Sequence, residues 1–162
     1  MAIRLIVKDP DPVLRERAIE VTKFNANLHK LLNDMAETMY DAEGVGLAAP
    51  QVAISKRVIV VDVGDERGLI EMVNPEIVEM NGEQLGPEGC LSINNLNGDV
   101  RRAQHIRIKG LDRNGVPFEM EAADFLARAF QHEVDHLNGI LFTDIAESIY
   151  DASARPPRQP GE

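Results

Sequence analysis

The chain has a single cysteine, no tryptophan, and only 4% aromatic residues among its 162 amino acids. A lone cysteine cannot form an intramolecular disulfide, which fits a reducing compartment. Thiols in such a compartment serve as metal ligands or nucleophiles more often than as crosslinks. Composition alone leaves two interpretations of Cys90: a small buried apolar side chain, which is the commoner case, or a functional thiol.

The sequence also lacks long apolar runs and has little positive charge. No run approaches the roughly 20 residues that span a bilayer, and the first residues turn charged and proline-containing before a signal-peptide core is complete. We therefore expect a cytoplasmic protein with no membrane partner. The 27 Asp and Glu outnumber the 17 Lys and Arg, for a formal net charge of −10. Direct nucleic-acid recognition is not expected, because it requires clustered Lys and Arg.

The length allows one well-filled core, so we predict a single domain over residues 1–150. The remaining residues, 151–162, are polar and proline-rich without any period, and we expect them to be disordered.

Two amphipathic helices are predicted from apolar residues at helical spacing, one over 25–41 and one that starts near Asp124 and ends at Asn138-Gly139. A glycine-rich turn at 44–51 is followed by a β-branched run that predicts a buried strand. In the next run, Pro75 indicates an edge or bent strand. Asn114-Gly115 between alternating runs predicts a hairpin. These elements indicate an α+β fold, with small antiparallel β-sheets packed around a central helix.

The second helix contains His132, Glu133 and His136 in a His-Glu-x-x-His pattern. At about 100° per residue, both imidazoles project together with the carboxylate beside them. Two neutral imidazoles can hold a divalent metal, and Glu133 can reach a water bound to that metal. The alternative is a pair of ordinary histidines on a polar helix face, because short motifs also match by chance.

A catalytic metal normally has three protein ligands and one open position. The downstream carboxylates of Asp144 and Glu147 follow too closely on the helix end to be good candidates. Upstream, Cys90 is the one soft ligand available, so a site made of a thiolate and two imidazoles is the hypothesis. Ligand chemistry alone would suggest Zn²⁺.

Three segments together resemble the signature motifs of the bacterial-type peptide deformylases, in order and separation: GVGLAAPQ (44–51), EGCLS (88–92) and QHEVDH (131–136). The resemblance covers about residues 5–145. It implies hydrolysis of the formyl amide on the N-terminal methionine of nascent polypeptides, with release of formate. It also implies that Cys90, His132 and His136 hold the metal, usually Fe²⁺, for which Zn²⁺, Ni²⁺ or Co²⁺ can substitute.

The resemblance further implies roles for residues around the metal. Glu133 would transfer the proton, while the side-chain amide of Gln51 and the backbone N–H of Leu91 would donate to the developing oxyanion. The segment Gly44, Val45, Gly46 is expected to run beside the bound peptide as an added strand would. Three residues are expected to line the methionine pocket, although each also suits an ordinary core position: Val45, Phe125 and Ala129.

Four charged residues are expected to support these motifs. Glu88 and Asp135 are candidates to accept hydrogen bonds from the metal-bound imidazoles. Glu43 and Arg102 are expected to form an ion pair that braces the first and second motifs.

The chain departs from many bacterial members after Ile93, where Asn94-Asn95-Leu96-Asn97 replaces a proline-containing sequence. The ligands are untouched, but the resemblance does not determine the conformation of this loop or the peptide preference beyond methionine. The expected partners are N-formylmethionyl nascent peptides, with a transient ribosome contact. The short segment after Ile149 gives no basis for the C-terminal helix by which some members dock.

Two alternatives stay open at this stage. The first is a zinc metalloprotease that cuts internal peptide bonds and shares the His-Glu-x-x-His chemistry. The second is a non-catalytic binding module with a structural metal site. Structural sites are closed by four ligands, and the sequence offers no convincing fourth one.

Overall fold

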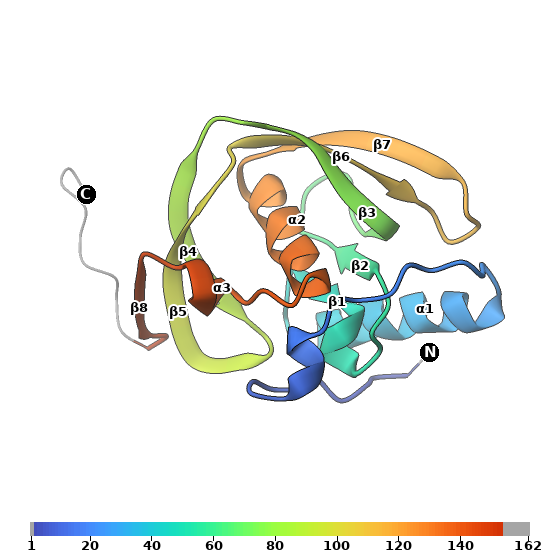
Figure 1. Cartoon of the computed structure of the whole chain (residues 1–162), viewed down its shortest axis with the longest axis horizontal. Coiled ribbons are helices and arrows are strands. Elements are labelled where there is room, and N and C mark those ends of the chain that lie inside the picture. Colours follow the sequence, from blue (N-terminus) through green and yellow to red (C-terminus); the bar gives the residue numbers. More distant parts are fainter. Residues whose placement is uncertain (1, 154–162) are drawn as a thin grey trace.

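The computed structural model describes residues 2–153, which form two antiparallel sheets and a central helix (Figure 1). In chain order the elements are the 3₁₀ helix η1 (Pro12–Arg15), α1 (Ala26–Asp41), β1 (Gly46–Ala48), the 3₁₀ helix η2 (Ala49–Val52), β2 (Val58–Val61), β3 (Ile70–Asn81), β4 (Gln84–Cys90), β5 (Ile93–Arg102), β6 (His105–Leu111), β7 (Pro117–Ala123), α2 (Asp124–Leu137), α3 (Phe142–Ile145) and β8 (Ser148–Asp151). The α+β class predicted from the sequence is confirmed.

The five-stranded sheet has the order β1-β2-β3-β6-β7 and carries a helix on each face. Successive side chains of a strand point to opposite faces, and β2 shows this clearly because all its residues are buried. Ile59 and Val61 pack in the cluster that contains α2, whereas Val58 and Val60 pack in the cluster that contains α1. The predicted buried strand is thus at the centre of the core.

Helix α1 forms where the helical spacing predicts it. The side chain of Asn25 accepts a hydrogen bond from the backbone N–H of Leu28 at 3.1 Å, which satisfies one donor at the helix start. The apolar stripe predicted from the sequence is buried: Leu28, Leu31, Leu32, Met35, Ala36 and Met39.

Helix α2 lies in the middle of the molecule, between the two sheets (Figure 1). Every residue from Leu126 to Glu133 is buried, so neighbours cover the helix on all sides. At its C-terminal end Asn138 is the cap and Gly139 has a φ of +74°, as the Asn-Gly pair predicts. The guanidinium of Arg57 donates to the carbonyl of Leu137 at 2.9 Å, so this buried helix end is satisfied.

Pro75 lies in a bent strand, not in an edge strand. Strand β3 is the central strand of its sheet, and its register with β6 shifts between Val73 and Glu76. A proline cannot donate to a strand ladder, so inside a sheet it is confined to irregularities such as this register shift. The predicted hairpin is also present: β6 and β7 pair in register, and Gly115 in the connection has a φ of +81°.

Two segments expected to be turn or loop contain regular structure. The segment 44–51 includes β1 and most of η2, so only residues 44 and 45 lie outside regular elements. The asparagine-rich segment forms the first part of β5, where Leu96 and Asn97 pair with Asp151 and Tyr150 of β8. The partner strand lies more than 50 positions away in the sequence, so a comparison of local motifs could not predict that this segment is a strand.

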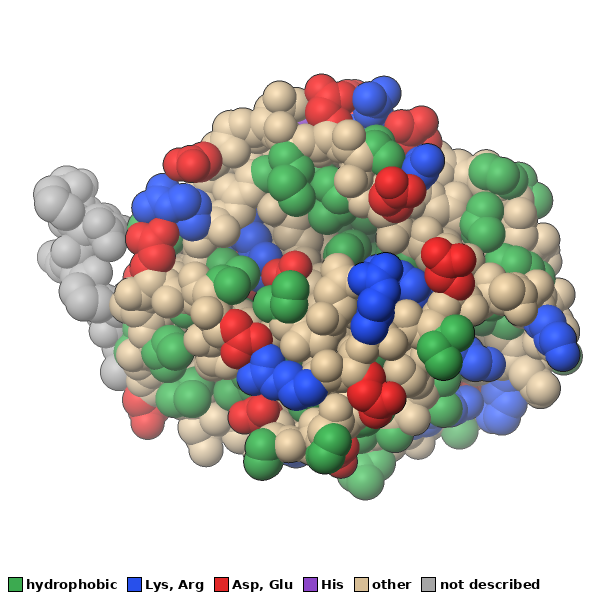
Figure 2. All heavy atoms as spheres, in the orientation of Figure 1, with side chains coloured by type: hydrophobic (Ala, Val, Ile, Leu, Met, Phe, Trp, Pro, Cys, Tyr) green, Lys and Arg blue, Asp and Glu red, His purple; other side chains and the backbone are tan. Residues whose placement is uncertain are grey.

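The predicted tail begins inside a strand, since Asp151 ends β8, and residues 154–162 lie outside the described part of the chain. None of the helices in residues 2–153 has the length and apolar character needed to cross a membrane. On the face drawn in Figure 2, basic and acidic side chains are interspersed rather than gathered in one basic track.

Candidate metal centre and active site

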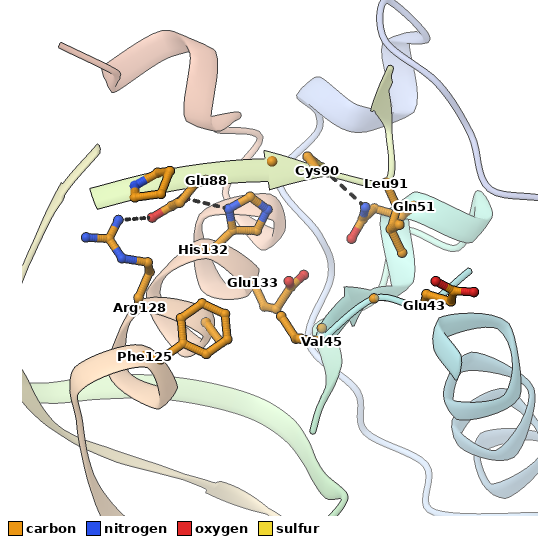
Figure 3. Close-up of a pocket in the computed structure, with 15 residues that line it drawn as sticks. Glu43, Val45, Gln51, Glu88, Cys90, Leu91, Phe125, Arg128, His132 and Glu133 are labelled. Atoms are coloured by element: carbon orange, nitrogen blue, oxygen red, sulfur yellow. Dashed lines mark hydrogen bonds and ion pairs between the residues drawn. The ribbon is translucent and has the colours of Figure 1, made fainter. Parts of the chain in front are cut away.

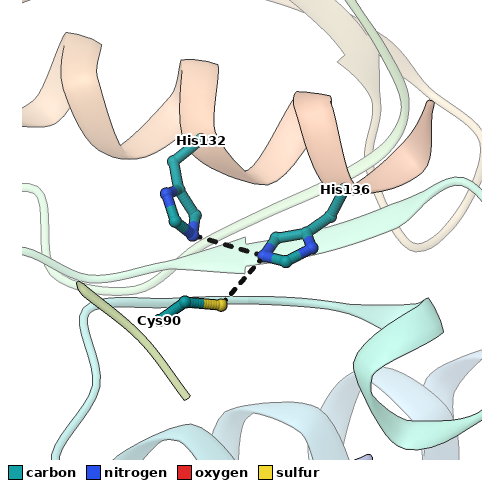
Figure 4. Close-up of side chains that lie close together, drawn as sticks. All are labelled: Cys90, His132 and His136. Carbon is teal, nitrogen blue, oxygen red and sulfur yellow. Dashed lines mark hydrogen bonds between the residues drawn. The ribbon is translucent and has the colours of Figure 1, made fainter. Parts of the chain in front are cut away.

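The structure brings together Cys90, His132 and His136, although 42 positions separate the cysteine from the first histidine (Figure 4). The two imidazoles project from successive turns of α2, and Cys90 lies at the end of β4. The Nε2 atoms of the histidines are 3.2 Å apart, and the Sγ of Cys90 is 3.3 Å from Nε2 of His136. One potential ligand atom from each residue lies within 4.8 Å of the others.

This donor set fits a divalent metal ion. A tetrahedral ion with bonds of about 2.0–2.3 Å has its ligand atoms about 3.3–3.7 Å apart, close to the distances found. Nδ1 of His132 faces the carboxylate of Glu88 at 2.8 Å, a contact that directs Nε2 toward the other two donors. Among residues 2–153, no fourth His, Cys, Asp or Glu joins the group. Three donors of this kind would leave one position of a tetrahedral ion open.

The Glu88 carboxylate is buried and accepts hydrogen bonds from three residues. Arg102 donates to both of its oxygens at 2.8 and 2.9 Å, and Arg128 donates to Oε2 at 2.7 Å. Burial alone would raise the pKa of Glu88, but the hydrogen bonds from Arg102 and His132 outweigh it and hold the pKa well below its ordinary value. Glu88 is thus ionised at neutral pH, beside the imidazole of His132.

The expected contacts of the other charged residues are partly wrong. Arg102 binds Glu88 and, at 2.6 Å, Asp135, so the predicted ion pair with Glu43 does not form. Glu43 lies on the other side of the cavity (Figure 3). Asp135 accepts from Arg102, and Nδ1 of His136 is buried without a hydrogen-bond partner. Glu88 is therefore the carboxylate found against an imidazole.

Glu133 points its carboxylate into the cavity between β1 and α2 (Figure 3). Its Oε1 is buried and unpartnered, and burial raises the pKa of the group to about 7. The backbone of Gly46 passes so close that a Cβ at that position would be 2.5 Å from Oε2 of Glu133. A carboxylate without a fixed partner is available to exchange a proton with a molecule in the cavity.

Gln51 and Leu91 both lie beside Cys90 (Figure 3). The amide of Gln51 donates to Oγ of Ser92 at 3.1 Å and lies 3.6 Å from the Sγ of Cys90. The carbonyl of Leu91 accepts from Nζ of Lys8 at 2.5 Å. Backbone N–H groups of residues 7 and 9 bond the carbonyls of Gln51 and Ser92, so the N-terminal segment joins the first two motifs.

A cavity of about 340 Å³ opens beside these groups. The residues predicted to contact peptide or methionine all border it: Gly44, Val45, Gly46, Phe125 and Ala129. Val45 and Phe125 are 39% and 51% exposed, so they form the rim, while Ala129 is buried at 5%. The exposed rim positions are not ordinary core residues.

The two carboxylates that follow α2, Asp144 and Glu147, are not part of the donor group and form ion pairs with arginines. Asp144 pairs with Arg15, and Glu147 pairs with Arg101. Sequence reasoning missed two residues of the site, Arg128 and Ser92. A charged residue four positions before His132, among the apolar residues of a buried helix face, was the available signal for Arg128.

Comparison with known proteins gives one consistent result. The family model for polypeptide deformylase matches residues 3–151. The chain is 58% identical to a peptide deformylase of Pelotomaculum thermopropionicum, over 92% of this chain and 95% of that protein. It is 53% identical to peptide deformylase 1 of Bacillus subtilis, over 93% and 94%.

Solved structures are similar over the same range. The crystal structure of a peptide deformylase from Thermotoga maritima superimposes with a TM-score of 0.88 at 44% identity, covering 91% of this chain and all of the other. One from Legionella pneumophila gives a TM-score of 0.87 at 49% identity, covering 90% and 87%.

Proposed function

The chain belongs to the peptide deformylase family and removes the formyl group from the N-terminal methionine of new polypeptides, and we propose that Cys90, His132 and His136 hold the metal ion for this reaction. The observation that carries the proposal is the convergence of these three donors beside a cavity that Cys90, His132 and Glu133 line.

A divalent ion bound by these residues would act as a Lewis acid and lower the pKa of a coordinated water to about 7. The donor set accepts several ions, and we assign Fe²⁺ as the cellular metal because it is the usual metal of the family. The same ligands suit Zn²⁺, Ni²⁺ and Co²⁺.

Glu133 is the proton-transfer residue in this proposal. Its unpartnered carboxylate faces the cavity, so it can accept a proton from water and deliver it to the leaving nitrogen. The amide of Gln51 and the backbone N–H of Leu91 are assigned to the formyl oxygen, where negative charge develops. Ser92 holds the amide of Gln51 in place.

The substrate backbone is assigned to the edge of β1. This strand ends the five-stranded sheet, and Gly44 and Gly46 border the cavity beside it, so an extended peptide can add to the edge. The methionine side chain enters between Val45, Phe125 and Ala129, as expected from the sequence.

The two alternatives have less support. The named relatives are deformylases over nearly their whole length, which speaks against an internal peptidase. A structural metal site lacks a fourth ligand in residues 2–153. We further propose that the enzyme acts in the cytoplasm, where nascent peptides emerge, and that it contacts the ribosome only transiently.

The test is formate release by metal-loaded protein from formyl-Met-Ala-Ser, with an unblocked peptide of the same sequence as the control. The expected result is stoichiometric formate from the first and no cleavage of the second. Cleavage of the internal bond, or no formate from protein with one metal per chain, would contradict the proposal.

A further inference from the structure

Arg128 donates one of the four hydrogen bonds that the Glu88 carboxylate accepts. Oε1 accepts from Arg102 and His132, and Oε2 accepts from Arg102 and Arg128. A carboxylate has about four acceptor sites, so this one is saturated. The contact of Arg128 limits rotation of the carboxylate and hence the direction from which Oε1 meets the imidazole of His132.

The same guanidinium connects the chain segments that carry the three donors. Arg128 lies on α2, one turn before His132, with 6% of its side chain exposed. Its Nη1 donates to the backbone carbonyls of Gly86 on β4 at 3.2 Å and Val100 on β5 at 2.9 Å. Arg128 thereby attaches the histidine helix to the hairpin that ends at Cys90.

Strand β4 leaves room for this contact because the residue beside the guanidinium is a glycine. A Cβ at position 86 would lie 3.2 Å from Nη2 of Arg128, closer than most side chains allow. Arg128 also balances charge in this group. Arg102 pairs with two carboxylates, those of Glu88 and Asp135, so one positive charge faces two negative charges. Arg128 adds the second positive charge to this buried group.

We propose that Arg128 is a positioning residue of the metal site, which acts through the Glu88 carboxylate and the β4 carbonyl to hold His132 and Cys90 at coordinating distance. The inference rests on the proposed function, because it assumes that these residues bind a metal. It assigns no direct contact between Arg128 and the ion or the substrate.

The experiment measures Zn²⁺ affinity by competition with a chromophoric chelator, for wild type, R128M and R128K. Loss of a residue that orients a metal ligand costs about 10- to 100-fold in affinity, so R128M is expected to bind at least about tenfold more weakly. R128K keeps one charged donor and is expected to lie between R128M and wild type. The thiolate absorption of the Co²⁺ form reports whether Cys90 still coordinates.

Arg101 provides the matched control. It is the exposed neighbour of Arg102 on β5 and pairs with Glu147, so R101M should bind Zn²⁺ as wild type does. If Arg128 acts through Glu88, R128M should weaken affinity much less in an E88Q background than in wild type. A merely structural role would lower the melting temperature of the metal-free protein without this coupling.

Wild-type affinity in R128M, or an undiminished loss in the E88Q background, overturns the inference. If R128M does not fold, R128Q replaces it, and equal affinity of R128Q and wild type has the same meaning. The proposed function fails separately, if C90A binds Zn²⁺ as tightly as wild type does.

Discussion

The backbone of Gly46 lies directly against the carboxylate of Glu133, too close for a side chain on residue 46 while that carboxylate keeps its position. A Cβ there would be 2.5 Å from Oε2 and 2.9 Å from the carboxyl carbon. The glycine of the 44–51 motif thus contributes to the site by leaving space for the carboxylate of Glu133 in the 131–136 motif. Glu133 is the flexible partner, so a larger residue at position 46 would displace its carboxylate.

The substitution Gly46→Ala should lower kcat by at least about tenfold, because a misplaced proton-transfer group costs part of the 10²- to 10⁴-fold that such groups contribute. Metal content should stay at the wild-type level. Steady-state kinetics and metal analysis of the purified variant check this. In the double variant with Glu133→Ala, the loss should not exceed that of Glu133→Ala alone, and fully additive losses would show that Gly46 acts in another way.

Cys90→Ala and Glu133→Ala should separate metal binding from proton transfer. Removal of the thiolate leaves two protein ligands, so Cys90→Ala should lose the metal or bind it much more weakly. Glu133→Ala should keep the metal and lose about 10²- to 10⁴-fold in turnover. Metal analysis and formate release measure both. Normal activity in either variant would show that the assigned roles are wrong.

The buried Glu133 also predicts how the stability of the metal-free protein depends on pH. Its pKa is raised from 4.5 to about 7 in the folded state, so between these values the folded chain holds a proton that the unfolded chain has lost. Stability therefore falls as the pH rises through this window. Glu133→Gln removes the effect and should stabilise the protein at pH ~8 by at most about 3–4 kcal/mol, at about 1.4 kcal/mol per pKa unit, with little gain at pH ~5.

Chemical unfolding of metal-free wild type and Glu133→Gln at the two pH values measures this difference. A bound cation favours the carboxylate, which is why the metal must be removed. Glu66→Gln, at an exposed position between β2 and β3, is the control. A gain of the same size at both pH values would contradict a raised pKa of Glu133.

Ala129→Leu should test the methionine pocket. Ala129 is 5% exposed and borders the cavity, so a larger side chain there would fill volume that the methionine side chain of the substrate needs. Overpacking costs about 1–3 kcal/mol, so KM or kcat/KM for formyl-Met-Ala-Ser should worsen by roughly fivefold or more. A formyl-Ala peptide serves as the internal control, because its small side chain should be affected much less. An equal loss for both peptides would place the methionine elsewhere.

Local patterns predicted the elements of the fold well where a period of 3.6 or 2 residues was strong. The buried stripe of α1 and the burial of β2 follow from apolar spacing, because each side chain faces the same core as its periodic neighbours. The expected turn at 44–51 was wrong for Gly46–Ala48, since the pairing of this short strand with β2 is not visible in its own sequence.

The partners of Arg102 show where sequence reasoning ended. A pair with Glu43 is plausible from motif order, but the fold puts Arg102 at the end of β5, within reach of Glu88 on β4 and Asp135 on α2. Choice of an ion-pair partner depends on which segments the sheets and helix bring together. No local period carries that information.

The sequence by itself determined the chemistry of this protein: a lone thiol, a His-Glu-x-x-His helix and three motifs in a fixed order, because residue types and helical spacing are local properties. The tertiary structure decided which groups support that chemistry. Only the packing of β4 and β5 against α2 places Cys90 at His136 and directs Arg102 and Arg128 onto one carboxylate behind His132. Such contacts join distant segments, so they arise when the chain folds and cannot be read from any one stretch of it.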